Sequence, residues 1–76
     1  MRVKYHSYNE IELEPGDMIE FQTVYGNTQI GTIINIEHQG FPRNLTYLQI
    51  LTHDSIDNIN TNLIFRCKKV IESVTL

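Results

Sequence analysis

Two kinds of side chain in this sequence are typical of binding surfaces: aromatic residues beside expected turns, and basic residues in an expected loop and near the C-terminus. The aromatic residues are Tyr25 and Phe41, and the basic residues are Arg43, Arg66, Lys68 and Lys69. Exposed tyrosine and phenylalanine are favoured at protein interfaces. Aromatic rings flanked by cations also bind single-stranded nucleic acid, by stacking on bases and pairing with phosphates. These residues are therefore candidates for binding either a protein or a nucleic acid.

A run of acidic residues near the N-terminus is a further candidate surface. Glu10, Glu12 and Glu14 alternate with Ile11 and Leu13, which is the pattern of a strand with one buried face. The three carboxylates are therefore expected on the same exposed face. Such a stripe can dock on a basic partner or imitate the charge of a nucleic acid, whereas the simpler interpretation is protection of the strand against aggregation.

The other polar side chains form no recognisable catalytic or metal-binding set. The three histidines and Cys67 are zinc-ligand types, but they lack the close pairs found in zinc sites. His53, Ser55 and Asp57 are neighbours in an expected loop, which does not supply the rigid scaffold that a catalytic triad needs. The sequence therefore predicts a protein that is not an enzyme and that binds no metal or other cofactor.

Length and charge limit the classes further. The chain has 76 residues and a net charge of −3, so one small domain over residues 1–76 is expected. Nucleic-acid binders usually carry a basic surplus, and the acidic balance therefore favours a protein partner. The single cysteine excludes an internal disulfide and fits a reducing compartment. No stretch approaches the roughly 18–20 apolar residues that span a bilayer, so we expect a cytoplasmic chain without a membrane partner.

Composition also bears on origin and on secondary structure. There are eleven isoleucines and seven asparagines but no alanine. Isoleucine and asparagine have AT-rich codons, which points to a bacterial or phage genome. Alanine is the best helix former, so its absence disfavours helices, whereas isoleucine, valine, threonine and tyrosine favour strands.

The hydrophobic pattern predicts short strands separated by turns. Strands are expected over 10–14, 19–23, 30–37, 45–51 and 63–67, with turns at 15–16, 26–27, 40–44 and 54–62. Within 30–37, the alternation predicts that Ile30, Ile34 and Ile36 share one face. The apolar range 45–51 predicts a central strand covered on both faces. Residues 70–74 fit either a last short strand or a helical turn.

Five short strands in a chain of this length indicate an all-β fold. A closed barrel is preferred over a two-sheet sandwich, because closure removes exposed strand edges and the chain is too short to fill a sandwich. The sequence therefore predicts a small five-stranded barrel.

Three segments resemble the opening of SH3-like barrels of the KOW and Tudor kind. They are residues 14–21 with Pro15-Gly16-Asp17, the turn at 25–27, and residues 30–33 with Gly31. In such barrels a Gly-Asp pair leads into the first strand, and a glycine in the next strand lets it bend sharply. Residues 65–71 are similar to the closing strands. The resemblance implies an SH3-like barrel that binds a protein or, as KOW domains do, RNA.

The sequence thus favours a non-enzymatic protein-interaction module, such as a regulatory or accessory subunit. Its expected binding residues are Tyr25, Phe41, Arg43, Lys68, Lys69, Glu10, Glu12 and Glu14. The alternative is a KOW-like module that binds RNA or DNA with its loop aromatics and its four basic residues in the second half of the chain. Association into a homo-oligomer is a third interpretation, because the core is small.

Overall fold

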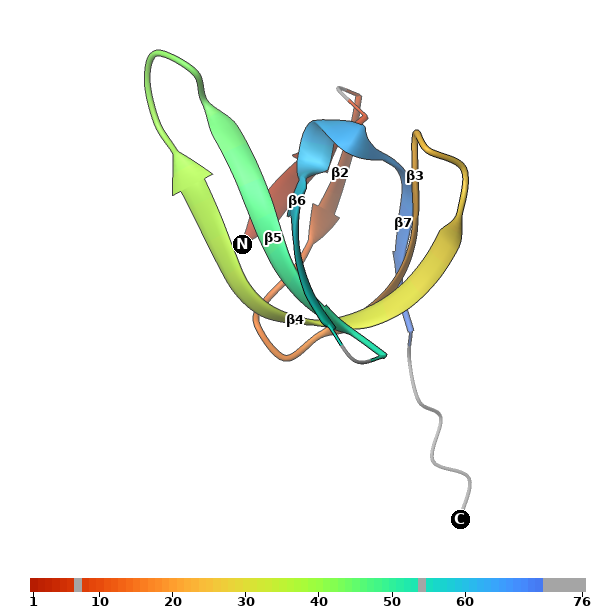
Figure 1. The fold of residues 1–76 in the computed structure, drawn as a ribbon. Helices are drawn as coiled ribbons and strands as arrows, with labels where there is room; N and C mark the ends of the chain where they lie inside the picture. The colour runs from red at the N-terminus through yellow and green to blue at the C-terminus, as the bar shows by residue number, and fades with distance from the viewer. Residues whose placement is uncertain (7, 54, 71–76) are drawn as a thin grey trace.

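The computed structural model describes residues 1–6, 8–53 and 55–70 (Figure 1). Along the described chain the elements are β1 Arg2–Tyr5, β2 Asn9–Glu12, β3 Met18–Thr23, β4 Thr28–Gln39, β5 Leu45–Thr52, β6 Ser55–Asn60, the 3-10 helix η1 Thr61–Leu63, and β7 Ile64–Lys69. The all-β class predicted from the sequence is confirmed. None of the helical segments in these residues has the length and apolar character needed to cross a membrane.

The strands form two antiparallel sheets. β1 and β2 make a separate hairpin, and the other five strands form a sheet in the order β6-β5-β4-β3-β7. Within the described residues no ladder joins the two edge strands, β6 and β7. The sheet is strongly curved, and η1 connects these two edges at one end of it (Figure 1).

The sequence pattern does not predict β1 or β6. The expected turn over 54–62 is wrong, because residues 55–60 form an edge strand paired with β5. Asparagine and aspartate are uncommon in strands, so this segment has the composition of a loop, and only its pairing with β5 makes it extended. Of the range 70–74, Val70 belongs to no strand or helix, and residues 71–74 lie outside the described residues.

β4 is shared by the two halves of the five-stranded sheet. β3 pairs with residues 28–32 of β4, whereas β5 pairs with residues 31–39. Where these ranges overlap, a Cβ atom on Gly31 would lie 2.9 Å from the carbonyl oxygen of Leu51 and closer still to the side chain of Ile50. β4 can therefore pack on β5 at this point only because residue 31 has no side chain. This agrees with the role that the sequence predicts for Gly31.

A register shift follows directly after this contact. Ile33 and Asn35 pair with successive residues of β5, which leaves Ile34 as the extra residue of a β-bulge. The bulge reverses the alternation, so Ile36 packs against the core while Ile30 and Ile34 are exposed. The expectation that these three isoleucines share a face is therefore wrong. A period of two residues does not reveal an inserted residue.

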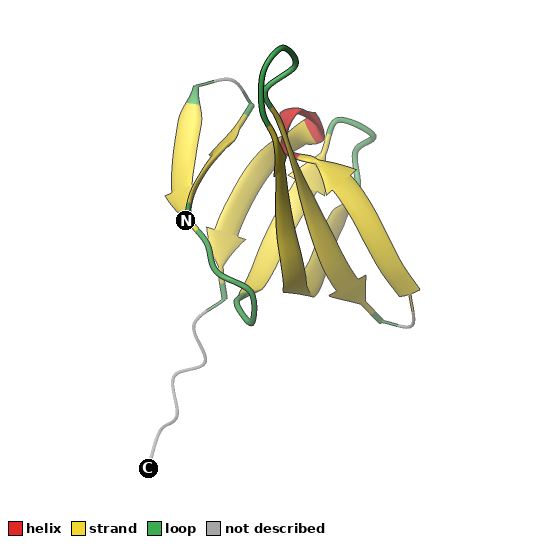
Figure 2. Cartoon of the chain, turned by 90° about the vertical axis from the view of Figure 1, so that its left-hand side faces the viewer, coloured by secondary structure: helices red, strands yellow, loops and turns green. Residues whose placement is uncertain are grey.

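The hairpin lies beside the curved sheet (Figure 2). One hydrophobic core joins the two. Its fully buried side chains are Val3, Leu13, Ile19, Phe21, Ile33, Leu48, Ile50 and Ile64. Val3 comes from β1 and Leu13 directly follows β2, so the hairpin supplies part of the core. The Tyr5 hydroxyl donates a hydrogen bond to the carbonyl of Cys67 at 3.4 Å, which ties the hairpin to β7.

β5 is an interior strand of the sheet, but only one of its faces is covered. Leu48 and Ile50 are fully buried, whereas Leu51 is 47% exposed. The expectation that residues 45–51 are covered on both faces is therefore wrong. The continuous apolar run arises because Leu51 is apolar and yet points to the outer face of the sheet.

Replacing Gly31 with alanine should destabilise the protein by about 1–3 kcal/mol, the usual cost of overpacking a tight contact. Gly40 offers a matched control, since a Cβ there meets nothing within 4 Å, and Gly40→Ala should change the free energy of unfolding by no more than about 0.5 kcal/mol. Urea unfolding followed by circular dichroism measures both. Equal stabilities for the two variants would contradict the packing role of Gly31.

Candidate functional site

The loop residues predicted to bind a partner lie at opposite ends of β4. Tyr25, in the turn before β4, is 79% exposed, and Phe41, in the loop after it, is 97% exposed. The 12 residues of β4 separate the two loops, a path of about 40 Å at roughly 3.3 Å per residue. Figure 1 shows the loops on opposite sides of the molecule. The structure therefore does not bring Tyr25 together with Phe41 and Arg43.

The two predicted lysines of β7 are both engaged with carboxylates. The Nζ atom of Lys68 lies 3.3 Å from Glu20, and that of Lys69 lies 3.4 Å from Asp17. Such exposed pairs contribute little to stability. The carboxylates nevertheless offset the positive charge that would attract a phosphate group. Lys68 and Lys69 therefore do not form a free basic patch.

A hollow of about 370 Å³ lies beside β7, with Tyr5, Phe65, Arg66 and Lys68 in its lining. The Arg66 guanidinium is 5.7 Å from the centre of the Phe65 ring. The His6 ring meets the same ring edge-on, with 4.9 Å between centroids. Two of the predicted basic residues, Arg66 and Lys68, thus lie together beside an aromatic side chain that the sequence analysis did not single out.

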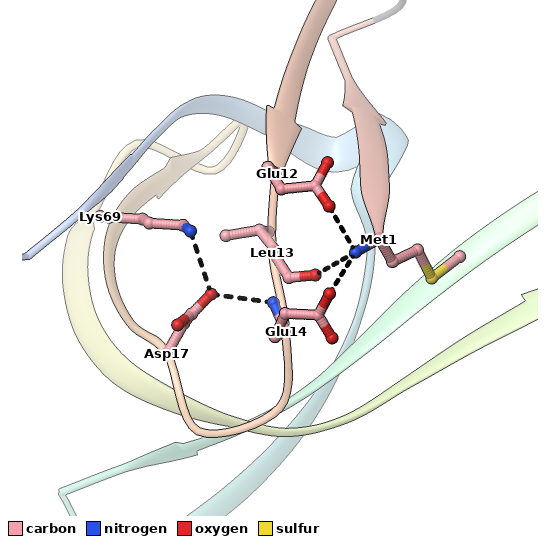
Figure 3. Close-up of polar contacts among 6 residues, drawn as sticks. All are labelled: Met1, Glu12, Leu13, Glu14, Asp17 and Lys69. Atoms are coloured by element: carbon pink, nitrogen blue, oxygen red, sulfur yellow. Dashed lines mark hydrogen bonds and ion pairs between the residues drawn. The ribbon is translucent and has the colours of Figure 1, made fainter.

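The acidic stripe is largely neutralised within the hairpin. The N-terminal amine donates hydrogen bonds to Glu12 at 2.8 Å, to Glu14 at 2.6 Å and to the carbonyl of Leu13 at 3.0 Å (Figure 3). Arg2 lies 3.5 Å from Glu10. The contacts with Glu12 and then Glu14 raise the pKa of the amine, and the hydrogen bond from the amine lowers the pKa of Glu12. These carboxylates therefore have structural partners within the chain.

Asp17 fastens the turn that leads into β3. Its carboxylate accepts the backbone N–H of Glu14 at 2.8 Å and faces Lys69 (Figure 3). The same turn is bonded to β4, since Gly16 N–H donates to the carbonyl of Ile33 at 2.7 Å and Ile33 N–H donates to that of Asp17 at 2.8 Å. The bond from Glu14, together with Lys69, lowers the pKa of Asp17.

Cys67 packs as an apolar side chain against the core. Burial raises the pKa of its thiol to about 11, and a neutral thiol is neither a good nucleophile nor a good metal ligand. Within residues 1–6, 8–53 and 55–70, no group of three or more histidine, cysteine, aspartate or glutamate side chains is placed to hold a metal ion.

Aliphatic side chains gather instead on the outer face of the five-stranded sheet. Thr32 of β4 pairs with Met18 on one side and with Leu51 on the other, and Leu51 pairs in turn with Ile56. Paired residues of neighbouring strands share a face, so these side chains form one row across β3, β4, β5 and β6. Ile30 lies two residues before Thr32 on the same face, and we define the aliphatic patch as Met18, Ile30, Leu51 and Ile56. All four are exposed, Ile56 to 60%.

The outer face of β5 and β6 beside the aliphatic patch carries no charge. Its other outward side chains there are Tyr47, Gln49, Asn58 and Asn60. Depletion of charged residues distinguishes the centre of a protein interface from ordinary surface. On this side the aliphatic patch therefore has the composition of a contact surface, whereas on the β3 side it is bordered by Glu20, which pairs with Ile30 and lies 3.3 Å from Lys68.

The sequence analysis did not identify the aliphatic patch, although one signal was present. Ile50 and Leu51 are adjacent apolar residues in a strand, so one of them must point outward. Because the strand was expected to be covered on both faces, this outward residue was not recognised as exposed. Ile56 was hidden because its segment was expected to be a turn.

Comparison with known proteins shows no relative of this chain. It matches no family model, and neither the curated proteins nor the solved structures give a match. The chain's own residues are therefore the basis for inferring its function.

Replacing Asp17 with asparagine should make stability less sensitive to acid. Because the folded state lowers the pKa of Asp17, this carboxylate stabilises the fold above its unfolded pKa, near 3.8, and the contribution is lost as the pH falls through the folded pKa. Thermal melts at neutral pH and at about pH 2.5 should therefore show a smaller drop in Tm for Asp17→Asn than for the unmodified chain. Glu37→Gln removes an exposed carboxylate elsewhere and is the matched control for the loss of one charge; identical drops for all three proteins would contradict the role of Asp17.

The thiol of Cys67 should react slowly in the folded protein. With a pKa of about 11 against an ordinary value of 9.0, the thiolate fraction at pH 8 falls by about 100-fold. The rate of reaction with a disulfide reagent at pH 8 should therefore be at least about 100-fold lower in buffer than in denaturing urea. Similar rates in the two solutions would show that Cys67 is not shielded by the hairpin and the core.

Proposed function

We propose that the five-stranded sheet is a small barrel of the SH3-like kind. The order β6-β5-β4-β3-β7, the 3-10 helix between the last two strands and the bend of β4 at Gly31 support this assignment. They agree with the resemblance to KOW and Tudor barrels carried by Pro15-Gly16-Asp17 and Gly31. The β1–β2 hairpin is an addition that precedes the barrel and contributes Val3 to its core.

The protein acts as a non-enzymatic module that binds another protein, and the aliphatic patch is the observation that carries this proposal. Burial of one large aliphatic side chain contributes about 1.5–3 kcal/mol, and the four residues of the aliphatic patch leave much of this contribution unused in the folded chain. Contiguous exposed apolar surface surrounded by polar residues marks interaction sites. A partner that covers the patch would gain this free energy.

Charge favours a protein over a nucleic acid as the partner. Affinity for nucleic acid comes largely from cations placed on phosphates, whereas the chain has a net charge of −3 and its β7 lysines already face carboxylates. Arg43 lies in the loop after β4, away from Arg66 on β7. The cations of the RNA- or DNA-binding alternative are thus dispersed or paired.

Introducing a charge into the aliphatic patch should abolish partner binding without unfolding the chain. Leu51→Glu and Ile56→Glu should each lower the amount of partner that the tagged protein captures from a lysate of its host by roughly tenfold, as expected for a central interface residue. Gln39→Glu is the matched control, because it adds the same charge at the far end of β4. Thermal melts of all three variants should stay close to that of the unmodified chain.

Nuclease treatment of the lysate distinguishes the two classes of partner. Capture that survives nuclease and is lost in both glutamate variants supports the proposal. Capture that disappears with nuclease, or that persists in both variants, would contradict it. Recovery of nucleic acid in that case would direct attention to Arg66 and Arg43.

A further inference from the structure

β6 has one edge free of strand pairing in the described part of the chain. It pairs only with β5 there. Thr52 and Ser55 face each other across a two-residue connection, and the closing pair of such a tight hairpin is hydrogen-bonded. Because hydrogen-bonded and non-hydrogen-bonded pairs alternate along an antiparallel ladder, Ile56 and Asn58 direct their N–H and C=O groups away from β5. They are therefore available to a further strand.

The free edge contains one charged residue, Asp57. β6 has no lysine or proline, the residues that commonly prevent an edge strand from pairing. Asp57 faces the inner side of the sheet, because it pairs with the buried Ile50. There its carboxylate accepts a hydrogen bond from the Thr52 hydroxyl at 3.4 Å. A carboxylate in this position disfavours an apolar strand beside it and favours one that presents a cation.

A hollow of about 340 Å³ opens on the inner side of the same edge. Asp57, Asn58 and Ile59 line it on one side, and Tyr25 and Asn27 of the β3–β4 turn line it on the other. Asp57 is the only charged side chain among the described lining residues. A cationic side chain in the hollow would meet a carboxylate and an aromatic ring, and both attract it.

We propose that β6 and this hollow bind an extended basic segment of a partner protein, added to the sheet as a further strand. Its backbone pairs with Ile56 and Asn58, and a lysine or arginine of the segment enters the hollow between Asp57 and Tyr25. The next side chain along the segment points to the outer face and extends the aliphatic patch beside Ile56. The net charge of −3 adds a general attraction for such a segment. This inference rests on the proposed protein-binding function and specifies the kind of segment that is bound.

A second copy of this chain is a poorer occupant of the edge. In an antiparallel pairing of β6 with itself, Asp57 faces another Asp57 or an uncharged residue, because β6 contains no basic side chain. Like charges placed directly opposite in a sheet are destabilising. The carboxylate of Asp57 would then remain without a cation.

Peptide titrations of ¹⁵N-labelled protein at low ionic strength test the proposal. The probes are short blocked peptides in which valine alternates with lysine, with serine or with glutamate. We expect amide shift changes on β6 and on the turn around Tyr25, with affinity falling from the lysine to the serine to the glutamate peptide. Hydrogen exchange of the Ile56 and Asn58 amides should slow when the lysine peptide is bound.

Two charge-neutralising variants make the test specific. Asp57→Asn should weaken binding of the lysine peptide by about fivefold and remove its advantage over the serine peptide. Glu20→Gln removes the same charge from β3, with β4 and β5 between it and β6, and should preserve that advantage. Equal effects of the two variants would mean that only the net charge matters, and would overturn the site.

The remaining outcomes are equally decisive. Shift changes confined to β7 or to the outer face would overturn the assignment to β6, and so would equal affinities for the three peptides. Dimerisation in sedimentation, with the β6 amides protected when no peptide is present, would identify a second copy as the occupant. Leu51→Glu should lose partner capture yet still bind the lysine peptide, so a failure of this inference can be distinguished from a failure of the proposed function.

Discussion

At Gly31 the backbone of β4 packs so closely on β5 that no side chain fits between them. β3 uses the first part of β4 and β5 uses the rest, so the sheet changes direction where these ranges overlap. The contact fixes which side chains turn inward: Ile33 enters the core, while Thr32 joins the row of outward residues that includes Leu51. The arrangement of the core and that of the outer surface therefore both depend on the absence of a side chain at Gly31.

The inner and outer faces of the sheet contribute differently to the stability of the fold. The inner residues are fully buried, and their packing specifies the fold. The outer residues Leu51 and Ile56 have no such role, because a polar side chain at either position would leave the core unchanged. Their apolar character is consistent with selection for contact with something outside the chain. The half-buried carboxylate of Asp57 is partly similar, since it lines an open hollow and has only a long hydrogen bond, 3.4 Å, from the Thr52 hydroxyl of β5.

The all-β class and five of the seven described strands could be predicted because alternation and turn residues are local signals. The pattern failed where a strand depends on its partner, because the asparagine-rich β6 is extended only through its pairing with β5. It also failed at Ile34, because a fixed period of two residues cannot indicate a bulge. The site was harder to predict, because proximity between loops depends on the length and bend of β4. Tyr25 was identified from its place beside an expected turn, but its neighbour across the hollow, Asp57, required the three-dimensional arrangement.

The core of this protein also constrains the order of events during synthesis. Val3 belongs to the same cluster as Ile64, and Tyr5 bonds to a carbonyl 62 residues further along the chain. Contacts between such distant segments form slowly, because a long loop must close before they are gained. On the ribosome the first hairpin is made early, but η1 and β7, against which β1 packs, emerge much later. During that interval the core around Val3 and Leu13 lacks Ile64, and protection by a chaperone would have its greatest effect on this protein then.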